Sequence, residues 1–68
     1  MKKEPQIQHP KVVARYKDYE ITKSETLGMY YGFQGSQHIG HNEQLSQVIS
    51  IISLREGEGF DINKVEIC

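Results

Sequence analysis

The chain contains no tryptophan, two prolines and a single cysteine among its 68 residues. Cys68 has no second cysteine to pair with, so an intramolecular disulfide is excluded. A reducing, cytoplasmic location is expected, and a thiol bonded to a partner is the alternative. The longest apolar run, Val48 to Leu54, is interrupted by two serines and is too short to cross a bilayer, so no membrane partner is expected. The opening residues MKKEPQIQHPK lack an apolar stretch, so we expect no signal peptide.

The chain has no large excess of charge of either sign, because eight basic residues against nine acidic ones give a formal net charge of −1. The charges are unevenly spread, because residues 1–23 hold six lysines and arginines against three acidic residues. Residues 24–68 hold two basic residues against six acidic ones. The net charge gives no indication of nucleic-acid binding. The distribution of charge indicates a basic N-terminal part and an acidic C-terminal part.

A chain of this length forms one domain with a thin core, because it buries only ~60% of the surface that its unfolded form exposes. Residues 1–10 contain both prolines and few apolar side chains, and we predict a flexible N-terminal arm there. Residues 11–68 are predicted to form a single small domain. So small a domain has little room for a deep catalytic cleft.

The segment from Val12 to Lys23 is predicted to be a β-hairpin with Lys17-Asp18 as its turn. This register pairs Tyr16 with Tyr19, Ala14 with Ile21 and Val12 with Lys23. The apolar side chains of both strands then fall on the same face, as a sheet with one buried face requires.

A third strand is predicted in LGMYYGFQ, where the apolar residues alternate with glycines and polar residues. The alternation places Leu27, Met29, Tyr31 and Phe33 on the buried face and leaves Tyr30 pointing outward. QGSQ is predicted to be a turn, and QHIG to add at most a short stub of strand.

The periodicity changes to that of a helix after Asn42. Four apolar residues fall on one stripe: Leu45, Val48, Ile49 and Ile52. Asn42 is the expected N-cap, Glu43 a first-turn acid, Arg55 a last-turn base and Gly57 the C-terminal stop. The β-branched run from Val48 to Leu54 also fits a strand, but the caps favour a helix.

These elements predict an α+β fold, in which a three-stranded antiparallel meander carries one amphipathic helix on one face. The sequence FDINKVEI adds an optional short C-terminal strand with Val65 and Ile67 on one face.

The tetrapeptide His38-Ile39-Gly40-His41 resembles the HIGH signature of class I aminoacyl-tRNA synthetases. The resemblance implies a Rossmann fold in which the histidines help to stabilise phosphates during adenylate formation. The chain is several times shorter than that domain and leaves no room for parallel crossovers. The family's second, lysine-bearing motif should lie C-terminal to HIGH. The only faintly similar segment, Ile21 to Ser24, lies N-terminal to HIGH. We therefore reject this resemblance and predict that the histidines mark a turn before the helix.

His38 and His41 also have spacing that is compatible with metal binding, but a second ligand pair is missing. We predict no metal site and no cofactor; the remaining alternative is an ion shared between two copies of the chain. Neither the serines nor Cys68 belong to a recognisable catalytic group, so we predict that the protein is not an enzyme.

Surface recognition is the function class that remains. We predict a binding face from five residues: Arg15, Lys17, Tyr30, His38 and His41. Aromatic and basic side chains on an open sheet suit single-stranded nucleic acid, and an open face or a free strand edge suits a protein partner equally well.

The layout YKDYEI, YYGF and HIGH followed by an amphipathic helix resembles small uncharacterised open reading frames of phages and mobile elements. The resemblance covers about residues 12–55 and implies an accessory or host-directed protein that acts by binding. Our first hypothesis is a non-enzymatic protein-interaction module that forms a homodimer. The alternative is a nucleic-acid-binding accessory protein that uses the outer sheet face and the basic N-terminal arm.

Overall fold

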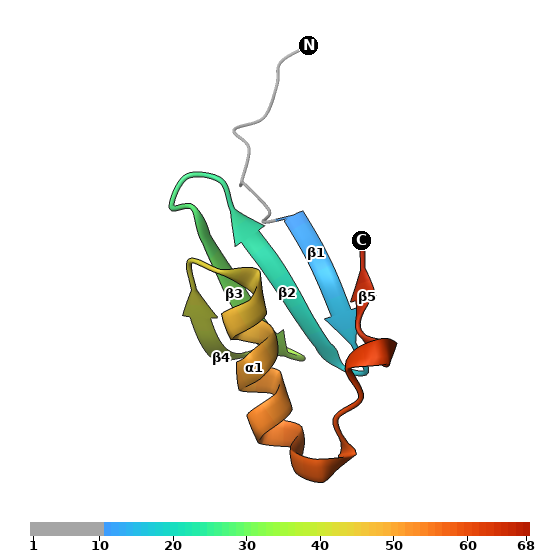
Figure 1. Ribbon diagram of the computed structural model, residues 1–68. Helices are drawn as coiled ribbons and strands as arrows, with labels where there is room; N and C mark the ends of the chain where they lie inside the picture. The colour runs from blue at the N-terminus through green and yellow to red at the C-terminus, as the bar shows by residue number, and fades with distance from the viewer. Residues whose placement is uncertain (1–10) are drawn as a thin grey trace.

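The computed structural model describes residues 11–68, and the predicted N-terminal arm, residues 1–10, lies outside them. Four strands of six residues come first: β1 (Lys11–Tyr16), β2 (Tyr19–Ser24), β3 (Met29–Gln34) and β4 (Gln37–Asn42). The helix α1 (Leu45–Glu56), two 3-10 turns (Gly57–Gly59 and Ile62–Lys64) and β5 (Glu66–Ile67) follow. The strands form one antiparallel sheet in the order β4-β3-β2-β1-β5, and α1 covers one of its faces (Figure 1).

The α+β class with an antiparallel sheet and a single helix is confirmed for this part of the chain, but the prediction of three strands is wrong. QHIGHN forms a full strand where only a stub was predicted, because Gly35, at φ 62°, supplies the tight turn that folds it back onto β3. The C-terminal strand is confirmed only at Glu66–Ile67, which pairs with β1; a 3-10 turn occupies Ile62–Lys64.

The β1–β2 hairpin has the predicted turn, and Tyr16 pairs with Tyr19 and Ala14 with Ile21. All four of these side chains are buried. The predicted pairing of Val12 with Lys23 is wrong, because the register shifts between Val12 and Ala14 and Val12 pairs with Thr22 instead. A bulge of this kind adds one residue to a strand and turns the residues before it to the other face.

The helix is confirmed over Val48 to Leu54, and Val48 and Ile52 are buried in the core. It begins later than predicted, at Leu45, so Glu43 lies outside the first turn and Asn42 is the last residue of β4. The Asn42 side chain instead accepts a hydrogen bond from the Gln44 backbone N–H at 2.9 Å, which is an Asx turn that leads into the helix. Gly57, at φ 70°, ends α1 as predicted, with Arg55 in the last turn.

The helix lies on the glycine side of β3 and β4, which reverses the face predicted for β3. A Cβ atom on Gly32 would come within 2.9 Å of Val48, and one on Gly40 within 2.7 Å of Ile51. Tyr30, two residues from Gly32, therefore lies on the helix side, where it packs against the core. The prediction that Tyr30 points outward is wrong, as is the assignment of Tyr31 and Phe33 to the core.

Candidate functional site

The sheet surface opposite α1, called here the open face, is covered by no other element within residues 11–68. The segment after the helix also packs on the helix side, where the Phe60 and Tyr16 ring centres lie 4.9 Å apart. Tyr31 lies on the open face, and strand pairing places its partners His41 and Thr22 on the same face. An antiparallel sheet can pack one face on the core and leave the other in water. The exposed side chains of this face make it the main candidate for binding.

Four rings gather on the open face of β3 and β4: Tyr31, Phe33, His38 and His41, called here the ring cluster. The ring centres of Tyr31 lie 5.8 Å from His38 and 5.5 Å from His41. Phe33 lies 5.5 Å from His38, and the two imidazoles lie 5.4 Å apart with their planes 17° from parallel. These spacings fall in the range of favourable aromatic pairs, so the rings form one continuous surface.

The four residues of the ring cluster differ in their exposure to solvent. Tyr31 and Phe33, on β3, are half-buried. His38 and His41, on the edge strand β4, are exposed. No hydrogen bond joins either imidazole to a carboxylate or a hydroxyl in the described part of the chain. The cluster therefore offers apolar contact area with polar nitrogens at its rim.

A bulge in β4 brings the two histidines together. His38 pairs with Phe33 and Gly40 with Gly32, so Ile39 is the extra residue. The Ile39 side chain lies 3.4 Å from the position of a Cβ atom on Gly32, which places it on the helix side. His38 and His41 consequently share the open face. The prediction that they mark a turn is wrong, because both lie within β4.

The positive charge on the open face is already matched by negative charge. Arg15 donates to Glu20 at 3.1 Å, and Glu66 of β5 pairs with Arg15 across the sheet. The hydrogen bond with Glu20 and the nearby negative charges raise the pKa of Arg15 above its usual value. Because both side chains are about half exposed, the ion pair adds little to stability, but it leaves Arg15 poorly available to an anionic ligand.

The structure does not bring the five predicted binding residues together. Arg15, His38 and His41 share the open face, on opposite halves of the sheet. Tyr30 lies on the helix side with the Lys23 ammonium 5.6 Å from its ring centre. Lys17 lies in the β1–β2 turn, where its ammonium donates to Glu56 at 3.1 Å.

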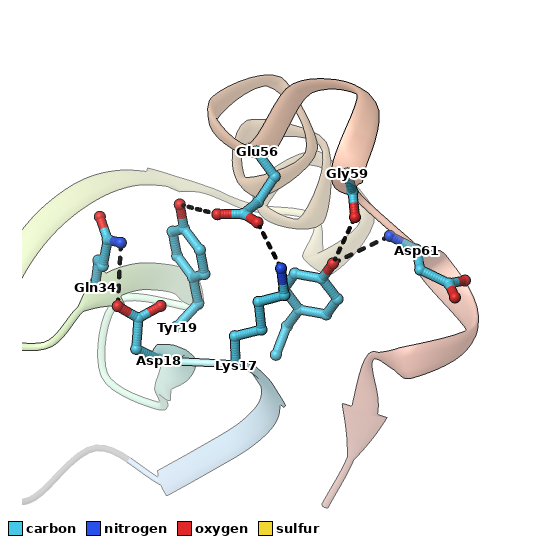
Figure 2. A network of polar contacts seen from close by, with 8 residues as sticks. Lys17, Asp18, Tyr19, Gln34, Glu56, Gly59 and Asp61 are labelled. Atoms are coloured by element: carbon cyan, nitrogen blue, oxygen red, sulfur yellow. Dashed lines mark hydrogen bonds and ion pairs between the residues drawn. The ribbon is translucent and has the colours of Figure 1, made fainter.

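Lys17 and Glu56 belong to a polar network that joins the hairpin turn to the end of α1 (Figure 2). The Tyr19 hydroxyl donates to the other Glu56 oxygen at 3.1 Å, and burial raises the pKa of Tyr19 above its usual value. The Tyr16 hydroxyl donates to the Gly59 carbonyl at 3.3 Å and accepts from the Asp61 N–H at 3.1 Å. The network anchors the C-terminal segment to the hairpin turn and to the end of α1.

Sequence reasoning missed Tyr31 and Phe33 as surface residues. The signal that could have located them is the pair of glycines at 32 and 40, because a glycine inside a strand often marks the close approach of another backbone element. Each glycine lies one position from a ring-cluster residue along its strand, and the alternation of a strand then places those rings on the opposite face.

Comparison of the chain with known proteins finds no matching family model, no matching curated protein and no matching solved structure. None of the helices between residues 11 and 68 has both the length and the apolar character to cross a membrane. Over the same residues, no group of three or more histidine, cysteine, aspartate or glutamate side chains is placed to hold a metal ion.

Proposed function

We propose that this protein is a non-enzymatic protein-interaction module that binds a partner protein through the ring cluster on the open face. The observation that carries the proposal is the continuous surface of four rings on a face that residues 11–68 leave uncovered. Aromatic side chains are enriched at protein interfaces, and clustered exposed apolar groups mark docking surfaces. The partner that fits presents apolar or aromatic side chains, with acceptors or donors for the imidazole nitrogens.

The charges of the open face support a protein partner over a nucleic acid. Nucleic-acid binding draws most of its affinity from lysine and arginine contacts with phosphates. Arg15 is engaged by Glu20, and Glu66 adds a further negative charge beside it. An approaching phosphate backbone therefore meets a face with little free positive charge in the described part of the chain.

A second copy of the chain is one partner of this kind, and we include a homodimer in the proposal. β4 is an edge strand of the sheet, and the ring cluster lies directly beside that edge. Symmetric association through the same surface on both copies is the commonest route to a dimer. Sedimentation of the purified chain as a monomer at high concentration would exclude this part of the proposal.

The cellular setting is proposed from the sequence. One unpaired cysteine suits a reducing cytoplasm, and the resemblance to small phage and mobile-element reading frames suggests an accessory or host-directed role.

The proposal is tested by affinity capture from a lysate with and without nuclease, using the unaltered chain, a Tyr31→Ala Phe33→Ala variant and a Leu27→Ala control. Leu27 is 64% exposed and lies in the β2–β3 turn, away from the ring cluster. The unaltered chain and the control should retain the same nuclease-resistant protein, which the double variant should lose. A protein retained equally by the double variant, or released by nuclease, would contradict the proposal.

The second candidate is binding of single-stranded nucleic acid, which the ring cluster itself favours because bases stack on aromatic side chains exposed on sheets. Binding of labelled single-stranded DNA and RNA at two salt concentrations separates the candidates. A complex driven by phosphates must weaken steeply as salt rises. Tight, salt-sensitive binding that is lost in the Tyr31→Ala Phe33→Ala variant would replace the first candidate with this one.

A further inference from the structure

We propose that His38 and His41 form a bidentate site for a divalent transition-metal ion, with Zn²⁺ as the probe ion. The inference goes beyond the proposed function, because it requires no partner protein. Imidazole nitrogens are ligands that Zn²⁺, Cu²⁺ and Ni²⁺ prefer.

The β4 bulge creates this pair. In a regular strand, residues three apart point to opposite faces of the sheet. The extra residue at Ile39 removes that separation, so His38 and His41 stand next to each other on the open face, opposite Phe33 and Tyr31. The sequence alone therefore does not predict that the two imidazoles lie close together, because an H-x-x-H segment in a regular strand would place the two side chains on opposite faces.

The separation of the imidazoles fits a shared ion. Nitrogen ligands lie ~2 Å from Zn²⁺, so two tetrahedral ligands have ring centres ~5 Å apart. The observed separation of the centres is 5.4 Å. The planes are 17° from parallel, so one ring must turn about its Cβ–Cγ bond to aim both nitrogens at one point. That torsion is broad for histidine, and both side chains are exposed and free of hydrogen bonds to other described side chains.

The ring cluster holds the pair in place. The ring centre of Tyr31 lies within 5.8 Å of both imidazole centres, and that of Phe33 lies 5.5 Å from that of His38. These contacts keep the two histidines side by side before an ion arrives, which lowers the cost of ordering them. Two protein ligands leave positions for water or for the same pair from a second copy, since residues 11–68 place no third ligand there.

Titration of the purified full chain with Zn²⁺ tests the site, followed by calorimetry and by the NMR signals of the histidine rings. We expect saturable binding, with chemical-shift changes concentrated at His38, His41 and Tyr31. The single variants His38→Gln and His41→Gln should each lose the saturable heat and these changes. Both histidines are exposed, so the variants should keep the fold, which circular dichroism verifies.

Two control variants, His9→Gln and Cys68→Ser, remove the chain's remaining histidine and its cysteine, and both should bind Zn²⁺ like the unaltered chain. Saturation at one ion per chain or at one ion per two chains equally supports the site, provided that His38→Gln and His41→Gln abolish it. Absence of saturable binding by the unaltered chain would overturn the proposal. So would binding that survives replacement of both His38 and His41, or that requires His9 or Cys68.

Discussion

Gly32 of β3 lies directly beneath Val48 of α1, so closely that a Cβ atom on Gly32 would come within 2.9 Å of the Val48 Cγ1 atom. Val48 is fully buried, and its β-branched side chain is stiff about χ1. This contact sets the distance between the helix and the sheet. It also decides which face of β3 is buried, and therefore leaves Tyr31 and Phe33 on the open face.

The first prediction concerns this contact. Gly32→Ala should lower the free energy of unfolding by ~1–3 kcal/mol, because the helix must move to relieve the overlap with Val48. Gly40→Ala is the matched comparison, since its nearest neighbour is the Cδ1 atom of Ile51, the mobile end of a half-buried side chain. Urea denaturation of both variants should show the smaller loss for Gly40→Ala. An equal or larger loss at Gly40 would mean that the helix does not rest on Gly32.

The same contact explains where sequence reasoning succeeded and where it failed. The hairpin was predictable, because the apolar side chains of β1 and β2 agree on one face only with Lys17-Asp18 as the turn. The helix was predictable from the spacing of Val48 and Ile52 and from Gly57. Each of these inferences needed only local periodicity and turn chemistry.

The face of β3 was not predictable by the same rule. The rule assigns the larger apolar side chains to the core, but the helix needs space, and Gly32 and Gly40 provide it. β4 was underestimated because its residues are mostly polar, which an edge strand tolerates. His38 and His41 lie side by side on one face only because of the bulge at Ile39, and a bulge has no clear signature in one sequence.

The second prediction concerns Lys17, the one non-glycine residue with positive φ among residues 11–68, at 54°. Lys17→Gly and Lys17→Ala both remove the ion pair with Glu56, so the difference between them isolates the backbone strain. The free energy of unfolding of Lys17→Gly should exceed that of Lys17→Ala by ~0.5–1 kcal/mol. This difference already includes the larger entropy of the unfolded glycine variant. Urea midpoints measure the difference, and a more stable alanine variant would show that the turn carries no such strain.

The third prediction concerns Thr22, which is only 8% exposed and whose hydroxyl oxygen has no hydrogen-bond partner among the described residues. Thr22→Val keeps the shape and removes the unpaired polar group, so it should raise the free energy of unfolding by ~1 kcal/mol. Thr26→Val in the exposed β2–β3 turn is the control and should change stability little. A destabilised Thr22→Val variant would reveal a partner for this hydroxyl, most directly a bound water.

The fourth prediction concerns pH and Tyr19, whose hydroxyl donates to Glu56 at 3.1 Å. Burial and this hydrogen bond raise the pKa of Tyr19 above its ordinary value of 10.0. A raised pKa in the folded state means that the unfolded chain loses the proton first as the pH rises. The stabilisation is therefore complete below pH ~10, the pKa of an unfolded tyrosine, and is lost as the pH rises toward the folded-state pKa.

Tyr19→Phe should accordingly lower the free energy of unfolding at pH 7 by ~0.5–1.5 kcal/mol, through loss of the hydrogen bond, and make its alkaline decline shallower. Some decline should persist, because the hydrogen bond with Glu56 also raises the pKa of Lys17. Tyr31→Phe on the open face is the matched control and should keep the full decline. Urea denaturation at a series of pH values from neutral to strongly alkaline makes the measurement. Parallel profiles for the unaltered chain and Tyr19→Phe would mean that the buried Tyr19 hydroxyl does not govern alkaline unfolding.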